Sequence, residues 1–357
     1  MIRRTCLHSA HQSAGARLVP FAGYEMPVQY TSIMAEAKAV RDSVGMFDVS
    51  HMARLEFTGS GVEPMLERTT TNDVSAIPAD GGQYSLLPNE RGGCIDDIIV
   101  YRLPDRFYLV VNASNHEKDL GWLNSHKSPG VSIRDETDDT AMIAVQGPDS
   151  EAVLSKLAGG RSLSEVPTFG VLTDSFAGVT ARAARSGYTG EDGFELICAA
   201  AGGEQLWDAL LEVGVTPCGL GSRDTLRVEA GFPLYGHELS DDLSPIAAGL
   251  GWVISKTKTF IGSGPINEAR EHGTLTRLVG IKLDSKRLTT PGMRVLVNGE
   301  EAGQVTSGII SPTFDTALAL AFIKREISLG TRCEVETRGK PEGGTIVGKR
   351  FYKRVKD

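Results

Sequence analysis

Before residue 276 the chain alternates short apolar runs with stretches in which apolar residues recur every three or four positions. Residues 107–112 and 141–146 are apolar runs of strand length, and helical spacing follows each of them. Residues 31–44 and 204–213 also have helical spacing, and a glycine stands directly after each. This part of the chain is therefore expected to combine α-helices and β-strands.

Single residues predict where some of these helices begin and end. Thr31 or Ser32 can cap the first helix, and Gly45 can end it. The sequence Ser114-Asn-His-Glu117 fits a capping box, in which serine and glutamate side chains bond to the free N–H groups of a helix start. Ser222 is the expected cap of a later helix.

The pattern changes between residues 258 and 276, and from residue 278 only strand-like runs occur. Six short runs follow one another, separated by turn residues. Asn298-Gly299 lies between two of them and favours a type I′ hairpin, because both residues tolerate a positive φ. We predict a small all-β domain of about 80 residues, either a barrel or a jelly roll.

Charge and apolar content limit the class of partner. The chain has 357 residues, with 37 Lys+Arg against 45 Asp+Glu and a net charge of −8. This balance argues against a nucleic-acid groove and against an anionic membrane surface, so an anionic ligand would need a few locally placed arginines. No apolar run approaches the ~20 residues of a membrane helix. The first residues lack the apolar core of a signal peptide, so we expect a cytoplasmic protein.

The cysteines are typical of reduced thiols. They are widely spread, form no CxxC pair and give no zinc signature. Their positions are Cys6, Cys94, Cys198, Cys218 and Cys333. His51 has no second His or Cys nearby, so no metal site is expected there either.

One stretch places two acids at the entry of an apolar strand. Asp96 and Asp97 follow the turn glycines Gly92 and Gly93 and precede the run 98–100. Side chains alternate along a strand, so one acid can face a pocket while the other faces solvent or caps the turn. An acid in an apolar strand is costly unless its charge is used. The alternative is that both are ordinary turn residues.

A second polar region begins at residue 186. Three glycines within seven residues make a loop that can approach a ligand closely, although it has neither P-loop nor dinucleotide-binding spacing. After this loop Glu195 enters an apolar strand with no evident partner. Arg223 and Arg227 lie four residues apart on one face of a predicted helix, where two guanidinium groups can bind a carboxylate. The alternative is a surface ion-pair ladder with neighbouring acids.

Taken together, six stretches resemble one family, the aminomethyltransferases, or T-proteins of the glycine cleavage system. They are Pro20-Phe-Ala-Gly-Tyr-Glu-Met-Pro-Val-Gln-Tyr30, Gly45-Met-Phe-Asp-Val-Ser-His-Met52, Gly92-Gly-Cys-Ile-Asp-Asp-Ile-Ile-Val100, Gly187-Tyr-Thr-Gly-Glu-Asp-Gly-Phe-Glu195, residues 218–231 and Thr306-Ser-Gly-Ile-Ile-Ser-Pro312. Each stretch alone is a weak signal. All six occur in the family's order and run nearly end to end, which makes the joint match strong.

The resemblance implies an α+β fold around a central folate cavity, with two mixed α/β subdomains and a C-terminal β-barrel or jelly-roll domain. We expect residues 1–275 to form the folate-binding aminomethyltransferase domain. Its two subdomains are expected to be discontinuous, the inner one at about 53–140. Residues 276–357 are expected to form the C-terminal β-barrel domain.

The resemblance also implies a one-carbon transfer in glycine catabolism. A carrier, the H-protein, would deliver an aminomethyl group on its lipoyl arm, and tetrahydrofolate would accept the methylene. Ammonia, 5,10-methylenetetrahydrofolate and the reduced lipoyl arm would be released. No metal is implied.

The family's key carboxylate falls on Asp96. A fixed carboxylate about 4 Å from a growing positive charge contributes about 4 kcal/mol at an effective dielectric near 20. That corresponds to about a thousandfold in rate. We expect Asp96 to orient the folate and stabilise developing charge rather than to abstract a proton.

Other residues are assigned to the folate rings by the resemblance. Glu195 would bind the pterin edge, where N–H donors suit a carboxylate. Tyr84, Tyr188 and Met52 would pack against the pterin and aminobenzoyl rings. Asn112, at a strand end, would add a polar contact, although it can also be a simple turn residue.

The folate tail would bind basic residues. Arg227 is assigned to its glutamate carboxylate, with Arg223 as a neighbour. A second base is expected near the C-terminus, where this chain has Arg350 in place of a common proline. That base could be Lys353 or Arg354, and Arg354 is preferred.

Two alternatives to this activity differ in product. A folate-dependent demethylase of a small sulfur or amine metabolite would share the folate pocket but yield 5-methyltetrahydrofolate. A non-enzymatic folate-binding relative would carry a Lys-Gly-Cys-Tyr-type motif where this chain reads Arg227-Val-Glu-Ala-Gly231, which argues against a pure binding protein.

Overall fold

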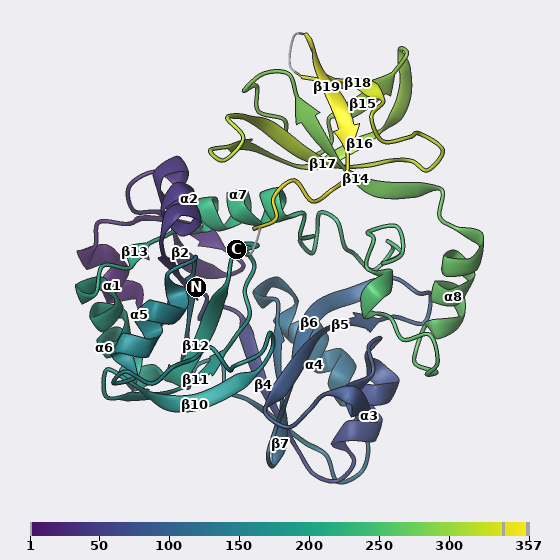
Figure 1. The fold of residues 1–357 in the computed structure, drawn as a ribbon. Helices are drawn as coiled ribbons and strands as arrows, with labels where there is room; N and C mark the ends of the chain where they lie inside the picture. The colour runs from purple at the N-terminus through teal and green to yellow at the C-terminus, as the bar shows by residue number, and fades with distance from the viewer. Residues whose placement is uncertain (1, 338–339, 355–357) are drawn as a thin grey trace. The chain divides into compact units, whose positions relative to one another are not determined.

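The computed structural model describes residues 2–337 and 340–354, which are drawn as a coloured ribbon in Figure 1. The chain divides into two compact units. Unit 1 contains Met1–Ser85, Asp97–Gly187 and Glu191–Arg223. Unit 2 contains Leu86–Asp96, Tyr188–Gly190 and Asp224–Asp357. Residues 338–339 and 355–357 of the predicted C-terminal domain lie outside the described residues.

A six-stranded sheet forms the larger core of unit 1. Its order is β10 (Val171–Phe176), β11 (Val179–Ala184), β12 (Gly193–Ala199), β9 (Thr140–Gln146), β3 (Gly45–Asp48) and β13 (Thr216–Pro217). All neighbours are antiparallel except the short β13, which runs parallel to β3. Helices α1 (His8–Ser13), α5 (Ser150–Leu157) and α6 (Ala200–Glu212) lie along this sheet (Figure 1). Trp207 of α6 is fully buried in the core between them, because the helix turns its apolar stripe inward.

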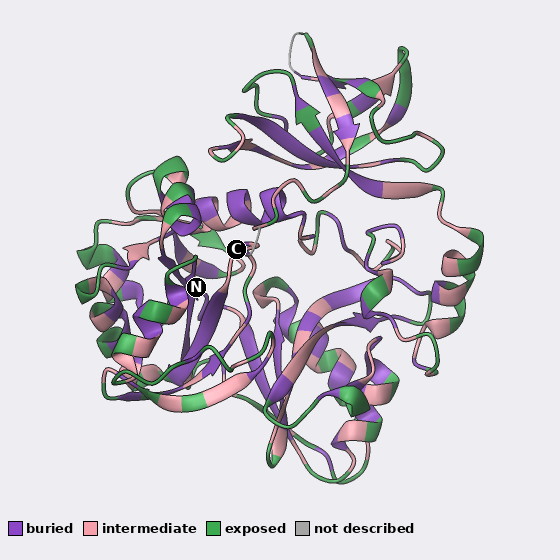
Figure 2. Cartoon of the chain, in the orientation of Figure 1, coloured by how far each residue is buried: buried purple, intermediate pink, exposed green. Residues whose placement is uncertain are grey.

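A five-stranded sheet is built from the segment between residues 53 and 135. Its order is β5 (Gly81–Pro88), β6 (Cys94–Leu103), β7 (Arg106–Val111), β4 (Ala53–Thr58) and β8 (Ser132–Asp135). Helices α3 (Val62–Thr69) and α4 (His116–Ser125) belong to the same segment. The buried strands of both sheets are purple in Figure 2. The remaining elements of unit 1 are the hairpin β1 (Arg17–Phe21) and β2 (Tyr24–Gln29), helix α2 (Ile33–Asp42), and the short 3₁₀ turns η1 (Val74–Ala76) and η2 (Ala113–Asn115).

The predicted helix ends are partly confirmed. Ser32 caps α2 by accepting a hydrogen bond from Ala35 N at 3.2 Å. The predicted stop at Gly45 is wrong, because α2 ends at Asp42 and Gly45 opens β3. A Cβ at Gly45 would lie 2.5 Å from Val40 Cγ2, so this glycine is needed for close packing.

Two predicted serine caps are wrong. Ser114 lies in the 3₁₀ turn η2, and α4 begins only at His116. Ser222 lies inside helix α7 (Leu220–Ala230) rather than before it. Polar groups at the start of α7 bond instead to a residue far away in the sequence. Glu36 of α2 accepts hydrogen bonds from Gly219 N at 2.8 Å and from Ser222 Oγ at 3.2 Å.

The C-terminal strands of unit 2 form a closed barrel, which decides between the two predicted all-β folds. Its order is β14 (Thr276–Leu283), β17 (Thr316–Lys324), β16 (Glu300–Ser311), β15 (Arg294–Val297), β18 (Arg332–Glu336) and β19 (Pro341–Val347), and β19 closes onto β14. Asn298 and Gly299 have φ values of 53° and 79°, so the predicted type I′ hairpin is confirmed. Helix α8 (Ser263–His272) and the turn η3 (Gly251–Val253) precede the barrel.

The second half of α7 packs on the barrel within unit 2. Val228 joins an apolar cluster with Leu278, Ile309, Leu318 and Leu320 on the strands. These apolar contacts hold the second half of α7 against the barrel strands.

Candidate active site

The adjacent acids of β6 have different surroundings, as strand alternation predicts. Asp96 is fully buried and shares its strand face with Cys94, which is also fully buried. The thiol of Cys94 donates a hydrogen bond to Asp96 O at 3.3 Å. Asp96 is therefore the more buried of the two acids, and its role in a ligand pocket stays a prediction.

Asp97 is half-buried and binds side chains from both neighbouring strands, a role that sequence reasoning missed. Tyr84 OH donates to Asp97 Oδ2 at 2.9 Å, and Asn112 Nδ2 donates to Asp97 Oδ1 at 2.9 Å. Tyr84 lies on β5 and Asn112 directly follows β7, the two strands that flank β6. One carboxylate therefore fixes two residues that sequence resemblance assigns to the folate. Only the pairing of three strands reveals this role.

Glu195 lies on β12 and is 5 % exposed. Its carboxylate accepts a hydrogen bond from Ser186 Oγ, and Ser186 is also 3.1 Å from Tyr101 OH. Burial raises the pKa of Glu195, while Ser186 and the charge of Arg223 offset only part of that rise. A carboxylate with so little support from the protein would be stabilised by N–H donors from a ligand.

Two other expected ring contacts are half-buried. Met52 lies in the turn after β3. In unit 2, Tyr188 stacks on Phe232 with ring centroids 5.7 Å apart, and Tyr188 OH donates to Pro233 O. Within unit 1, Tyr84 and Asn112 meet through Asp97, whereas neither Met52 nor Glu195 hydrogen-bonds to either of them among the described residues.

Arg227 is 1 % exposed, and its guanidinium forms hydrogen bonds and ion pairs within unit 2. It donates to Asp224 Oδ1 at 2.8 Å, Glu238 Oε2 at 2.9 Å and Ser307 Oγ at 2.7 Å. Of these partners only Asp224, whose side chain is 47 % exposed, faces solvent substantially. Near the C-terminus Arg354 is half-buried and Lys353 is exposed.

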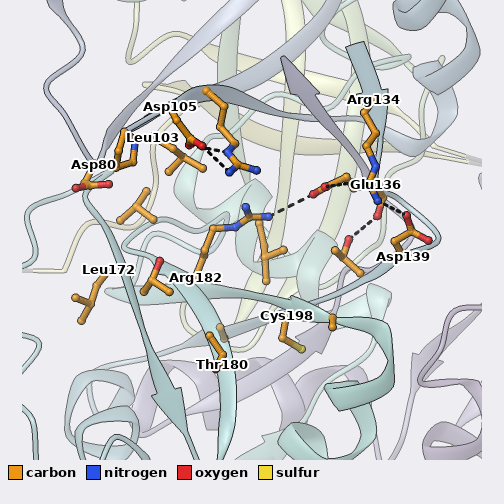
Figure 3. Close-up of a pocket in the computed structure, with 18 residues that line it drawn as sticks. Asp80, Leu103, Asp105, Arg134, Glu136, Asp139, Leu172, Thr180, Arg182 and Cys198 are labelled. Atoms are coloured by element: carbon orange, nitrogen blue, oxygen red, sulfur yellow. Dashed lines mark hydrogen bonds and ion pairs between the residues drawn. The ribbon is translucent and has the colours of Figure 1, made fainter. Parts of the chain in front are cut away.

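Unit 1 contains a cavity of about 780 Å³, whose lining residues are drawn in Figure 3. Its arginines are paired internally: Arg182 is 3.6 Å from Glu136, and Arg134 donates to Asp139 at 3.0 Å. Figure 3 shows Arg182 directed toward Glu136 across the cavity. None of the eight residues assigned to chemistry or folate lines this space.

The described residues contain no group of three or more His, Cys, Asp or Glu that could hold a metal ion. The five cysteines are free thiols, four of them buried. Within residues 2–337 and 340–354, no helix combines the length and apolar character needed to cross a bilayer.

Known families match almost the whole chain. Residues 7–258 match the family described as the GCVT N-terminal domain, and residues 276–353 match the glycine cleavage T-protein C-terminal barrel domain.

Individual relatives agree with this match. An aminomethyltransferase of Geobacillus thermodenitrificans is 45% identical over 100% of both chains. One of Bacillus licheniformis is 43% identical, over 99% of this chain and 100% of the relative. The crystal structure of the glycine cleavage system aminomethyltransferase T from Bartonella henselae has a TM-score of 0.92 and 31% identity, covering 99% of both chains. The chain therefore belongs to the aminomethyltransferase family of glycine cleavage T-proteins.

Proposed function

We propose that this chain transfers the methylene of an aminomethyl group from the lipoyl arm of H-protein to tetrahydrofolate, in the cytoplasm. Ammonia, 5,10-methylenetetrahydrofolate and the reduced lipoyl arm are the products. The observation that carries the proposal is the end-to-end similarity to aminomethyltransferases, which includes both the N-terminal domain and the barrel. Tetrahydrofolate supplies the nucleophilic nitrogens that accept the carbon.

The buried acids of the chain suit a reduced pterin. Glu195 receives one side-chain hydrogen bond from the part of the chain that the structure describes, so its carboxylate can accept others from the N–H groups of a pterin edge. Tyr84 and Tyr188 supply aromatic surface, and Asn112 supplies an amide fixed by Asp97. Met52 is assigned to the same rings.

Asp96 is proposed as the catalytic carboxylate. Its side chain is sheltered from water, so its charge acts in a medium of low dielectric. Positive charge grows on the carbon as ammonia leaves, and an ionised Asp96 stabilises that charge while holding the acceptor nitrogen in line.

The folate tail is assigned to Arg227 and Arg354. Because Arg227 already binds Asp224, Glu238 and Ser307, a tail carboxylate would compete with the exposed partner, Asp224. Arg227→Ala is therefore expected to weaken folate binding and also to destabilise unit 2, by about 3 kcal/mol, because Glu238 loses its ion pair.

The test mixes the protein with tetrahydrofolate and aminomethyl-loaded H-protein, then measures ammonia and the folate product. Equal amounts of ammonia and 5,10-methylenetetrahydrofolate support the proposal. Formation of 5-methyltetrahydrofolate from a methylated sulfur or amine compound would identify a demethylase instead. Folate binding without any product would identify a binding protein.

An Asp96→Asn variant tests the assigned chemistry. We expect turnover to fall about a hundredfold or more while folate affinity stays within a few-fold, because the charge acts mainly in the transition state. Full turnover by this variant would contradict the role of Asp96.

A further inference from the structure

His51 lies where two of the family's sequence stretches meet inside unit 1. It follows β3, and aromatic residues from the ends of β1 and β2 pack against its ring. Phe21 and Tyr24 both meet the imidazole edge-on, with ring centroids 5.6 Å and 6.3 Å away. His51 is 3 % exposed, so this packing leaves its ring little freedom to turn.

One arginine fixes the backbone on both sides of His51. Arg54 is fully buried and donates hydrogen bonds to Ser50 O at 2.8 Å and to Met52 O. Met52 N donates to Val49 O at 3.0 Å, which closes a turn around His51. His51 is therefore held by a rigid turn, directly before a residue that the resemblance assigns to the folate rings.

One ring nitrogen of His51 has no protein partner. Its Nδ1 is buried and makes no hydrogen bond among residues 2–337 and 340–354. His11, another buried histidine of unit 1, differs, because its Nε2 is 2.9 Å from Asp48 Oδ2 and its Nδ1 is 2.9 Å from Tyr30 OH. A buried polar atom without a partner costs free energy, so a rigidly held Nδ1 of this kind indicates a partner from outside the chain.

The surroundings of His51 indicate the chemistry of that partner. Phe21, which forms one wall of the site, is 41 % exposed, so this wall extends to the protein surface. Burial lowers the pKa of His51 to about 4, and the charge of Asp48 offsets only part of that fall. The imidazole is therefore neutral at neutral pH and has one donor and one acceptor nitrogen. Such a ring suits an uncharged group that carries N–H and C=O, as an amide does.

We propose that His51 is a further folate-binding residue, whose Nδ1 bonds to an uncharged amide-type group of tetrahydrofolate; this inference rests on the proposed function. Tetrahydrofolate has two such groups, the lactam edge of its pterin and the amide between its aminobenzoyl and glutamate parts. Met52, assigned to the pterin and aminobenzoyl rings, follows His51 in the same turn. His51 thus adds a neutral hydrogen bond to the charged one assigned to Glu195.

Replacing His51 by leucine tests this inference, because a ligand contact and a structural histidine predict opposite effects on stability. His51→Leu removes a buried nitrogen that the protein leaves without a partner, so the urea midpoint of unfolding should stay the same or rise. Titration calorimetry should show about tenfold weaker binding of tetrahydrofolate. His51→Asn restores a donor and an acceptor near the position of Nδ1, so its affinity should lie within about threefold of the unchanged protein.

His11→Leu is the matched control. It removes a buried imidazole whose two nitrogens are both bonded, so its urea midpoint should fall. Circular dichroism gives the folded fraction of each variant. The folded His11→Leu protein should bind tetrahydrofolate within about twofold of the unchanged protein.

A second titration, with tetrahydropterin, distinguishes the two amide-type groups. This ligand has the lactam edge but lacks the aminobenzoyl and glutamate parts. Weaker binding of both ligands by His51→Leu supports a contact with the lactam edge. Weaker binding of tetrahydrofolate alone supports a contact with the aminobenzoyl amide.

Two results would overturn the role of His51. One is unchanged tetrahydrofolate affinity in folded His51→Leu protein, and the other is a urea midpoint that falls as far as that of His11→Leu. Neither result contradicts the proposed function, which is tested by carbon transfer from H-protein. An unchanged protein that binds tetrahydrofolate through His51 but forms no 5,10-methylenetetrahydrofolate would overturn the proposed function alone. An unchanged protein that binds no tetrahydrofolate would overturn both.

Discussion

Asp48 in β3 and Glu195 in β12 are both buried carboxylates of the six-stranded sheet, yet the protein surrounds them differently. Asp48 is 2 % exposed and hydrogen-bonds to Thr5 Oγ1 at 2.7 Å, Ser50 N at 2.8 Å and His11 Nε2 at 2.9 Å. Among residues 2–337 and 340–354, Glu195 has one side-chain donor, Ser186.

The two pKa shifts follow this difference in hydrogen bonding. Burial alone would raise the pKa of Asp48, but its hydrogen bonds from His11, Ser50 and Thr5 outweigh burial and lower the pKa to about 2. For Glu195 burial prevails and the pKa is raised. Donors from the protein make a buried acid part of the scaffold, whereas few donors leave it able to bind a ligand.

The largest expected effect is on stability at Asp48. Asp48→Asn should lower the free energy of unfolding by about 3 kcal/mol, because an amide cannot accept from all these donors and leaves one unsatisfied. Urea unfolding measures this change. Asp42→Asn, on an exposed side chain of α2, is the control and should change stability by less than about 0.5 kcal/mol. Equal free energies of unfolding for Asp48→Asn and Asp42→Asn would show that the hydrogen bonds of Asp48 do not stabilise the fold.

A smaller effect on binding is expected at Glu195. Glu195→Gln should weaken tetrahydrofolate binding about tenfold, or about 1.4 kcal/mol, because the amide has one acceptor oxygen instead of two. The free energy of unfolding at neutral pH should not fall. Titration calorimetry of this variant and of the exposed control Glu212→Gln checks the expectation. Wild-type affinity together with a large loss of stability would make Glu195 a scaffold acid like Asp48.

The two acids should respond to pH with opposite sign. The pKa of Asp48 is lowered on folding, so its contribution is present above its ordinary value of 3.8 and is lost as pH falls toward 2. Relative to Asp48→Asn, the unchanged protein should lose about 1 kcal/mol between pH 7 and pH 3. The pKa of Glu195 is raised, so relative to Glu195→Gln the unchanged protein should gain stability as pH falls. Urea unfolding across this pH range would reveal slopes of the same sign if the comparison is wrong.

The smallest expected effect comes from Ser186, the donor to Glu195. Ser186→Ala should cost about 1 kcal/mol or less in the free energy of unfolding, since one hydrogen bond is lost. It should also raise the pKa of Glu195 further, and nuclear magnetic resonance titration of that carboxyl group can detect the change. An unchanged titration would show that Ser186 does not support the charge.

Local signals in the sequence predicted local structure well. Asn298-Gly299 specifies its own turn, because both residues reach positive φ at little cost, and the barrel follows from evenly spaced strand runs. Ser32 likewise caps the helix it precedes.

Distant partners could not be predicted from the sequence. The N–H group of Gly219, just before α7, donates a hydrogen bond to Glu36, which lies more than 180 residues earlier in the chain. Asp97 has its role through Tyr84 and Asn112, which only strand pairing brings to it. Among the partners of Arg227, Asp224 lies one turn away in the same helix, whereas Glu238 and Ser307 are brought to it only by the folding of the later segments.

The discontinuity of unit 2 has a consequence for synthesis on the ribosome. Leu86–Asp96 emerges before Asp224–Asp357, and at ~5–20 residues per second the wait is on the order of ten seconds. During this time Leu86, Leu87 and Ile95, which are buried in the finished protein, lack the later segment of their unit. A nascent chain that stalls before the barrel would expose this apolar strand start, making it a natural substrate for chaperones and proteases.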